Sequence, residues 1–269
     1  MLEMELAAAR DLNGDGVMDA NDRYGFATGH DWDISVAMFI ASGNKIVDRK
    51  EDGTLAFTLG EPKAIETMEM LKKMLKPGET FFPKDPAEGM EAYVKAFVDG
   101  KVLFLAYSRG YGMLDPIYEM EDDFGFIPLP MGNNTDKYLN WISHNAPVVG
   151  VPITNTELDK VGLVLQALAW KAQDEAKILE EEIAFTKLRD DESLETIKNL
   201  RSYGASDFAL LAQQMHSPTN VSLWTLPTVC FYDQSLEPVS EVERIKDAMD
   251  IALDELEAML RGEEITPAE

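Results

Sequence analysis

Residues 11–26 read Asp11-Leu12-Asn13-Gly14-Asp15-Gly16-Val17-Met18-Asp19-Ala20-Asn21-Asp22-Arg23-Tyr24-Gly25-Phe26, a run of oxygen-bearing side chains followed by an apolar stretch. A calcium ion takes about six to eight oxygen ligands, and a calcium loop supplies them from its first, third, fifth, seventh, ninth and twelfth positions. Gly16 stands at the sixth position, where such a loop turns sharply. The expected oxygen donors are Asp11, Asn13, Asp15, the Val17 carbonyl, Asp19 and Asp22.

The twelfth position departs from the pattern because it holds Asp22 instead of the usual glutamate. The shorter side chain brings both oxygens to an ion less easily, which predicts weaker binding or an altered geometry. The alternative interpretation is a solvated turn rich in Asp, Asn and Gly. The sequence holds no second copy of the loop, so it does not resemble a calcium sensor.

Composition and charge set limits on the class of protein. The 269 residues are 45% hydrophobic, which suffices for one large or two modest globular domains. A formal charge of −25 argues against nucleic acids and anionic membrane surfaces as partners. The single cysteine, Cys230, leaves no internal disulfide or thiolate metal cluster and fits a cytosolic or an exported bacterial protein.

No apolar run approaches the roughly eighteen residues of a membrane helix, and the first residues lack the pattern of a signal peptide. We therefore expect either an intracellular protein or a chain whose amino-terminal part is absent. Apolar periodicity predicts alternating helices and strands, which is typical of the α/β class. The predicted helices span residues 2–9, 33–42, 61–75, 86–98, 114–120, 157–173, 174–187, 190–203, 206–215 and 240–260. The predicted strands span residues 24–28, 45–47, 54–57, 101–107, 124–129 and 148–153.

Four details of these elements are open to direct test. Asp52-Gly53 is a turn signal that predicts a hairpin between its two flanking strands. The strand over 101–107 is apolar throughout, so we expect it in the centre of a sheet. Ser240-Glu241-Val242-Glu243 predicts a capping box at the start of the last helix. In the helix over 157–173, spacing predicts an inward face and a core position for the following residues: Val161, Leu165, Leu168 and Ala169 inward, and Trp170 packed with Leu163 and Ala167.

The order of several short motifs resembles that of bacterial extracellular solute-binding proteins of family 1, the sugar-capturing components of ABC importers. The calcium-type loop followed by Tyr24-Gly25-Phe26 is one of them. Ala96-Phe97-Val98-Asp99-Gly100-Lys101 resembles the family's F-x-x-G-K-x turn, and residues 122–130 resemble its D-D-F-G-x-x-P-x-P strand. Arg189-Asp190-Asp191-Glu192-Ser193-Leu194-Glu195 resembles a D-D-E-S segment of its lipoprotein-type members. The motifs keep the family order over nearly the whole chain.

This resemblance implies an α/β, periplasmic-binding-protein-like (type II) fold of two lobes with ligand held between them. Residues 1–130 and 206–269 would form the carboxyl-terminal-type lobe, and residues 131–205 the returning part of an incomplete amino-terminal-type lobe. The expected location is extracellular or periplasmic. The full-length form would be a membrane-anchored lipoprotein whose signal peptide and anchor are absent from this chain. The expected partners are a small-molecule ligand, a sugar, and the permease of an ABC transporter.

A sugar site needs exposed aromatic platforms beside polar groups that bind hydroxyls. Loops at the ends of three predicted strands carry this mixture, and the family places ligand contacts at the first two. A further tryptophan lies where family members bring a loop towards the cleft. The candidate ligand-binding residues are Trp32, Asp33, Tyr107, Arg109, Tyr111, Asn140, Trp141, His144, Asn145 and Trp224. For each of them the alternative is a structural role, as a packed ring or a surface ion pair.

Two other functions stay open at this point. A glycan-active hydrolase needs two carboxylates facing each other across a sugar, and 49 acidic residues leave many such pairs possible. A calcium-dependent interaction module would use the loop of residues 11–22. The sequence carries no nucleophile elbow, P-loop, dinucleotide fingerprint or His-Glu-x-x-His motif, so we expect no enzyme. We also expect that the chain can associate with itself through its incomplete lobe.

Overall fold

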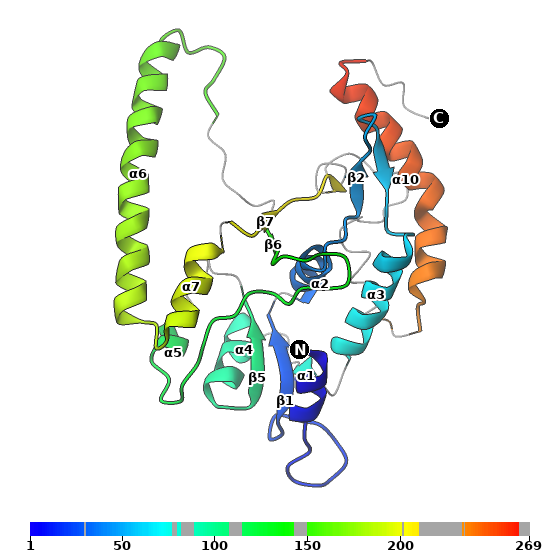
Figure 1. The fold of residues 1–269 in the computed structure, drawn as a ribbon, viewed down its shortest axis with the longest axis vertical. Coiled ribbons are helices and arrows are strands. Elements are labelled where there is room, and N and C mark those ends of the chain that lie inside the picture. The colour runs from blue at the N-terminus through cyan, green and yellow to red at the C-terminus, as the bar shows by residue number, and fades with distance from the viewer. Residues whose placement is uncertain are drawn as a thin grey trace.

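The computed structural model describes residues 1–29, 31–76, 80–81, 89–107, 115–142, 150–200, 202–209, 233 and 235–263. Figure 1 shows the arrangement of their helices and strands. In chain order the elements are α1 (Leu2–Ala8), β1 (Tyr24–Thr28), α2 (Asp31–Ala41), β2 (Val47–Arg49), β3 (Leu55–Phe57), α3 (Pro62–Met74), β4 (Thr80–Phe81), α4 (Gly89–Val98), β5 (Val102–Ala106), α5 (Asp115–Tyr118), β6 (Asn140–Trp141), α6 (Leu158–Thr186), α7 (Asp191–Asn199), β7 (Gly204–Ala205) and α10 (Pro238–Leu260).

The main sheet of the described chain is parallel, with strand order β4-β1-β5. Every residue of β1 is buried, as expected for a parallel strand covered on both faces. The prediction that the strand over 101–107 is central is wrong within the described residues. β5 lies at the edge of this sheet, and Leu103 is 43% exposed. An apolar run alone did not distinguish the edge strand from β1 beside it.

Helix α1 lies directly against β1, and Gly25 permits this approach. A Cβ atom at Gly25 would lie 2.2 Å from the carbonyl oxygen of Glu5. The side chain of Glu5 is fully buried in this contact region. The glycine after Tyr24 is therefore a packing requirement of the α1–β1 pair.

The largest core cluster lies between α2, α3, the β2–β3 hairpin and α10 (Figure 1). The hairpin forms as predicted, with Val47 opposite Phe57 in antiparallel register. Around its turn, the Gly53 amide donates to the Lys50 carbonyl over 2.9 Å. The fully buried side chains of this cluster include those of Phe26, Phe39, Ile46, Leu59, Met68, Leu71, Ile245 and Met249.

Several predicted boundaries shift in the structure. α10 begins at Pro238 with Glu237 as its N-cap, so Ser240 lies inside the helix and the predicted capping box is wrong. Proline is favoured in the first turn because its missing N–H would be unpaired there anyway. The helix predicted over 114–120 is limited to α5, and the one over 190–203 to α7.

The strands predicted over 124–129 and 148–153 are absent from the described residues: neither 124–129 nor 150–153 joins a sheet. Residues 120–126 instead contact Arg189, which precedes α7, and Ser193, which lies in α7. The Arg189 guanidinium donates to the carbonyls of Met120 and Asp122 and lies 4.7 Å from the Phe124 ring centroid. These contacts join residues of the predicted 1–130 and 131–205 segments, whose boundaries remain a prediction.

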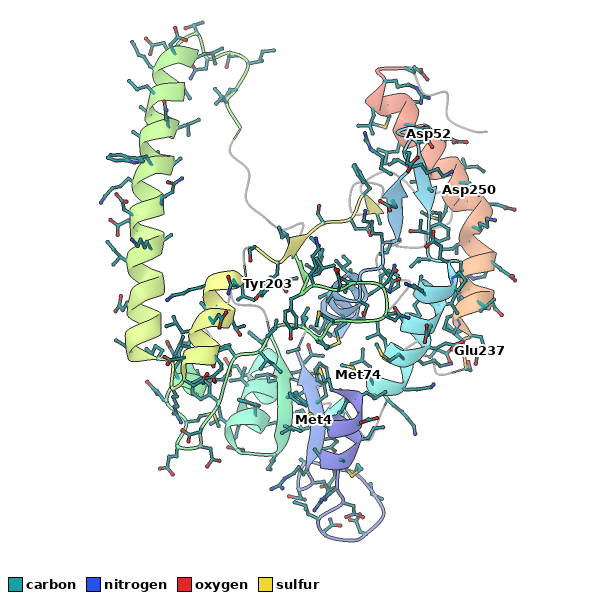
Figure 2. The ribbon with its side chains drawn as sticks, viewed as in Figure 1. Met4, Asp52, Met74, Tyr203, Glu237 and Asp250 are labelled. Carbon is teal, nitrogen blue, oxygen red and sulfur yellow. The ribbon has the colours of Figure 1, made fainter. Side chains whose placement is uncertain are left out.

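The two helices predicted over 157–173 and 174–187 are one continuous helix, α6, because no residue between them breaks the backbone pattern. The inward positions of this helix were predicted wrongly. Val161 and Leu165 are half-buried, but Leu168 is 61% exposed, Ala169 is exposed and Trp170 is 71% exposed. Figure 1 shows α6 standing apart from the sheet, and Figure 2 shows its side chains projecting on both sides of the ribbon.

None of the described helices combines the length and apolar character needed to cross a membrane. The helix predicted over 206–215 lies largely outside the described residues. The helix predicted over 86–98 has its first residues, from Pro86, outside them too.

Candidate functional site

The loop of residues 11–22 is closed at its base by the backbone. The Arg10 amide donates to the Arg23 carbonyl over 2.8 Å, and the Arg23 amide donates back to Arg10 over 3.1 Å. The two residues form an antiparallel bridge, and Arg23 directly precedes β1, so the base of the loop is joined to the sheet.

Inside the loop, carboxylate and amide oxygens accept hydrogen bonds from the backbone that curls around them. Asp11 accepts from the Gly14 amide over 2.6 Å and from the Gly16 amide over 2.7 Å. These backbone donors hold the pKa of the Asp11 carboxyl below its ordinary value. Gly16 has φ +81°, a left-handed conformation that the predicted sixth position requires and that glycine adopts without strain.

Asp22, the twelfth position of the pattern, is fully buried. Its two oxygens accept from the Leu12 amide over 2.8 Å and from the Asp19 amide over 2.7 Å. Close by, the Tyr24 hydroxyl donates to the Asp19 carbonyl over 3.0 Å. Burial, with the charges of Asp22 and Asp19, raises the pKa of that phenol. Asp22 therefore joins Leu12, near the start of the loop, to Asp19, near its end.

That the loop of residues 11–22 binds calcium stays a prediction. Across the described chain, no three acidic, histidine or cysteine side chains form a group that could hold a metal ion. Within the loop, the Val17 amide donates to Asp15 over 2.8 Å, and the Asp15 amide donates to Asn13 over 2.9 Å. The donor set still matches calcium in its chemistry, because it consists of carboxylate, amide and carbonyl oxygens.

The parallel register of β1 and β5 brings two of the predicted ligand segments to one edge of the sheet. Thr28 lies opposite Ala106, so both strands end at the same level. Trp32 and Asp33 follow β1 in the first turn of α2, and Tyr107 follows β5 directly. Carboxyl ends of neighbouring parallel strands are the usual place for a ligand in an α/β fold.

The remaining predicted ligand residues fall into two groups. Asn140 and Trp141 form β6, which lies against α2 and pairs with β7. Trp141 is half-buried against the main core cluster, and Tyr107 packs against a smaller cluster of Val94, Ile117, Met120 and Phe124. The side chains of Trp32 and Asp33 are outside the described part of the structure, as are the following residues altogether: Arg109, Tyr111, His144, Asn145 and Trp224.

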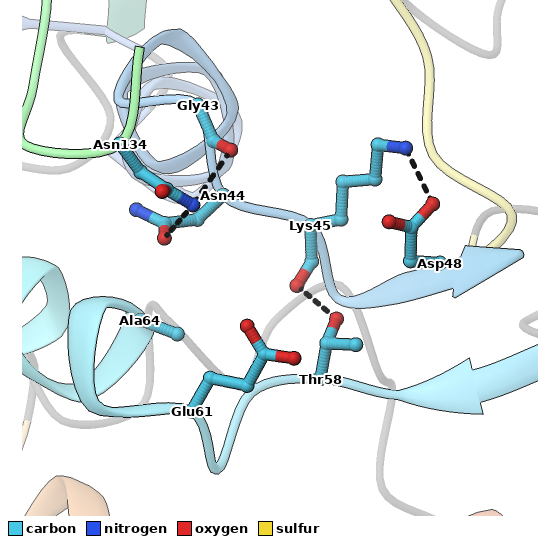
Figure 3. A pocket seen from close by; sticks show the side chains of 8 residues that line it. All are labelled: Gly43, Asn44, Lys45, Asp48, Thr58, Glu61, Ala64 and Asn134. Carbon is cyan, nitrogen blue, oxygen red and sulfur yellow. Dashed lines mark hydrogen bonds and ion pairs between the residues drawn. The ribbon is translucent and has the colours of Figure 1, made fainter. Parts of the chain in front are cut away.

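Sequence reasoning missed a polar junction between α2, α3 and residues 133–134, shown in Figure 3. Asn134 donates to the Gly43 carbonyl over 3.2 Å and to the Asn44 side chain over 3.3 Å. Asn44 is buried and donates in turn to Thr67 over 2.9 Å. The pair Asn133-Asn134 after Gly132 was the available signal, because asparagine side chains commonly bond nearby backbone.

This junction borders a hollow of about 70 Å³ whose lining includes Lys45, Asp48, Thr58 and Glu61. Sites for small organic ligands usually occupy about 300 to 1,000 Å³, so the hollow is too small for a sugar. A second hollow, of about 370 Å³, is large enough. Its lining has four carboxylates and no aromatic ring: Val98, Asp99, Glu119, Met120, Glu121 and Asp122. It lacks the flat apolar surface on which a sugar ring stacks.

Asp207 is a second residue that sequence reasoning missed. It is buried, and it accepts hydrogen bonds from the amides of Ile46, Val47 and Ala209 over 2.6, 3.1 and 2.8 Å. Burial raises the pKa of its carboxyl despite these bonds. The residue fixes the chain after β7 to the start of β2, and no local pattern around it predicts that contact.

Comparison with solved structures supports the predicted fold. No protein-family model matches the sequence, and no curated protein matches it. Among solved structures, the chain is similar to a cyclo/maltodextrin-binding protein in complex with maltotetraose, with 16% identity and a TM-score of 0.50. The match covers 88% of this chain and 60% of that protein, so the chain spans about three-fifths of its length. The likeness shows a periplasmic-binding-protein-like α/β fold, as predicted.

Proposed function

We propose that this protein binds a carbohydrate outside the cytoplasm as the solute-capturing component of an ABC importer, with a lipid anchor in its full-length form. The observation that carries the proposal is the fold, which matches a maltodextrin-binding protein over 88% of the chain. The order of the sequence motifs supports the same assignment. Fold alone does not determine function, so the proposal depends on the site at the strand ends.

The proposed ligand site lies beyond the carboxyl ends of β1 and β5. The register supports this location, because Thr28 lies opposite Ala106, a few residues before Trp32 and one residue before Tyr107. Aromatic rings there would stack on the apolar faces of sugar rings, while Asp33 and Arg109 would bind hydroxyl groups. Asn140, Trp141, His144, Asn145 and Trp224 would complete the site from the other lobe and the returning chain.

Ligand would draw the two lobes together, because contacts made only in the closed form shift the population towards it. The closed form would then be recognised by the permease. In this mechanism the protein performs no chemistry on the sugar. The proposed calcium ion has a structural role in the loop of residues 11–22, next to β1.

A thermal-shift and calorimetric titration against mono- and oligosaccharides, maltotetraose included, tests the proposal. Ligand at about a hundred times its dissociation constant adds roughly 2.7 kcal/mol to the free energy of unfolding. For a chain of this size that is a rise in Tm of about 5 to 10 °C. We expect such a rise with one class of sugar. No rise with any sugar would contradict the carbohydrate assignment.

A matched pair of tryptophan variants locates the site. Trp32→Ala removes a proposed stacking platform and is expected to weaken sugar binding by about fivefold or more, since a stacked aromatic ring contributes on the order of 1 kcal/mol or more. Trp170→Ala removes an exposed ring on α6 and should leave affinity unchanged. Product analysis of the same sugar after prolonged incubation distinguishes a binder from a hydrolase, because only a hydrolase releases new reducing ends.

A further inference from the structure

The loop of residues 11–22 contains Asn13-Gly14, the only Asn-Gly pair in the sequence. An asparagine side chain can react with the backbone nitrogen of the next residue, and glycine leaves that nitrogen unshielded because it has no Cβ. Each other asparagine of the chain is followed by a residue that carries a side chain. Asn13 and Gly14 are both exposed, and Figure 1 shows their loop projecting below α1 and β1. The sequence and the exposure of this pair therefore make it a candidate site of modification.

The side chain of Asn13 is turned towards the peptide that follows it. Its Oδ1 atom accepts from the Asp15 amide over 2.9 Å, and its Nδ2 atom donates to the Asp15 carboxylate over 3.0 Å. Both bonds reach across Gly14. A nucleophile that attacks the carboxamide carbon transfers negative charge to Oδ1, and a backbone N–H that already bonds this oxygen stabilises that charge. The Asp15 amide is therefore placed to assist such an attack.

The nitrogen of Gly14 bonds a proton acceptor. Its N–H donates to the Asp11 Oδ1 atom over 2.6 Å, a short distance of the kind found in bonds to an ionised carboxylate. The Gly16 amide donates to the other oxygen of Asp11 over 2.7 Å, so the carboxylate is held from both sides. A base within hydrogen-bond reach of the proton that it removes is the geometry of general base catalysis. The loop thus joins a nitrogen nucleophile and its base in one contact.

The space beside Gly14 is open for a ring to form. A Cβ atom built on this residue would meet no other atom within 4 Å. The base of the loop is closed by the bridge between Arg10 and Arg23, so a change at one peptide inside the loop leaves its ends joined. Packing therefore does not oppose ring closure between Asn13 and Gly14 on this side of the chain.

We propose that Asn13 is a site of deamidation, in which the Gly14 nitrogen attacks the Asn13 side chain and Asp11 accepts the proton. The nitrogen bonds to the carboxamide carbon while its proton passes to Asp11. The carbon then releases Nδ2, which takes the proton back from Asp11 and leaves as ammonia, and a succinimide ring remains. Water adds to one of the ring carbonyls and breaks its bond to the Gly14 nitrogen. Addition at the side-chain carbonyl yields aspartate, and addition at the backbone carbonyl yields isoaspartate.

Either product changes the charge of the loop. Residues 11–22 hold four aspartates and no cationic side chain, so the conversion raises the number of carboxylates from four to five. Isoaspartate also adds a methylene group to the main chain, which displaces Gly14 and Gly16 relative to Asp11. Calcium affinity depends on the charge and the geometry of the ligands. The conversion would therefore alter the proposed calcium site, in which Asn13 is one ligand.

Mass spectrometry of the aged protein tests the proposal. The complete chain is incubated at neutral pH in excess chelator, which keeps the oxygens of Asp11 and Asn13 free of metal ions. Digestion before aspartates then places Asn13 and Asn21 in separate peptides. The Asn13 peptide should gain the mass difference between an amide and an acid, and ammonia should appear in solution. Asn21 is the internal control, because it is exposed in the same loop but precedes Asp22. Equal retention of the two amides would overturn the proposal.

Two variants test the role of the Asp11 carboxylate. Asp11→Asn removes the proton acceptor and should slow the conversion of Asn13 by about tenfold to a hundredfold, since a positioned base contributes on the order of a hundredfold or more. Asp52→Asn creates a second Asn-Gly pair in an exposed turn. Gly53 there also has a positive φ, but its amide donates to the Lys50 carbonyl and not to a carboxylate.

In the Asp52→Asn protein, conversion at the new pair should therefore be slower than at Asn13. This comparison is made within one folded chain, so it does not depend on the stability of the Asp11→Asn variant, whose fold circular dichroism checks. Equal rates at the two pairs, or an unchanged rate at Asn13 in folded Asp11→Asn, would overturn the proposal.

Discussion

The backbone amide of Phe126 donates a hydrogen bond to the Ser193 hydroxyl over 2.7 Å. Ser193 in turn donates to Asp190 over 2.7 Å, and its own amide donates to the other oxygen of Asp190 over 2.6 Å. The D-D-F-G and D-D-E-S segments, 67 residues apart along the chain, are therefore partners. Asp190 also serves as the N-cap of α7, so one carboxylate orders both the helix start and the inter-segment contact.

Replacing Ser193 with alanine should destabilise the protein. Ser193 is 1% exposed, and the variant leaves the partly buried Phe126 amide without its acceptor. Such a loss costs about 1 to 3 kcal/mol, or a fall in Tm of roughly 2 to 12 °C. Thermal unfolding measures it. Ser202→Ala is the control, because Ser202 is exposed and its hydroxyl bonds only the nearby Asn199 carbonyl. Equal effects of the two substitutions would contradict the interpretation of the Ser193 contact.

Gly25→Ala should displace α1 from β1. The new methyl group would lie 2.2 Å from the Glu5 carbonyl oxygen, a distance at which backbone must move. We expect destabilisation of about 2 to 4 kcal/mol, in the range of overpacking and buried-contact losses. Gly150→Ala is the matched control, since a Cβ there meets no atom within 4 Å. Hydrogen exchange of the α1 amides provides a local readout, and unchanged protection in Gly25→Ala would contradict the close approach.

Elements set by local chemistry were predictable from the sequence. The Tyr24–Thr28 strand, the helix before the acidic loop and the hairpin at Asp52-Gly53 are each specified by residues within a few positions. For the candidate site, the sequence indicated loops at strand ends. That β1 and β5 are neighbours, and hence that Trp32 and Tyr107 follow strands ending at the same level, required the register of the sheet.

Features set by distant contacts were not predictable. Residues 124–129 have the composition of a strand, but Phe126 gives its amide to Ser193 instead of to a neighbouring strand. Asp207 meets the Ile46 amide 161 residues away, and nothing beside it in the sequence indicates that partner. Trp170 was expected in the core because helical spacing identifies an apolar face without showing what covers that face.

Asp15→Ala tests the proposed calcium ion. The variant removes one of the proposed ligands, so it should lower Tm in millimolar calcium but by little in excess chelator. In chelator the exposed Asp15 is expected to contribute within about 0.5 kcal/mol. Asp52→Ala is the control, because Asp52 makes a similar exposed bond to its own turn, at Thr54, outside the loop. An equal fall in Tm in calcium and in chelator would contradict the proposal that this loop binds calcium.

Asp207→Asn tests the buried carboxylate that fastens the chain after β7 to β2. Burial raises the pKa of Asp207 above its ordinary value of 3.8 in the folded protein, with Lys45 the nearby charge that opposes the shift. The folded state therefore holds this proton more tightly than the unfolded state. The stabilisation that results is complete below the ordinary pKa and is lost as the pH rises through the raised one.

The asparagine variant does not titrate, and its amide nitrogen cannot accept one of the three backbone N–H groups. It should be less stable than the wild type by about 1 to 3 kcal/mol at acid pH. The stabilisation that the raised pKa gives the wild type is lost as the pH rises from about 4 to about 8. The difference in free energy of unfolding between the wild type and the variant should therefore become smaller over that range. Denaturant unfolding at several pH values measures this difference, and a difference that grows with pH would mean that the folded-state pKa of Asp207 is lowered.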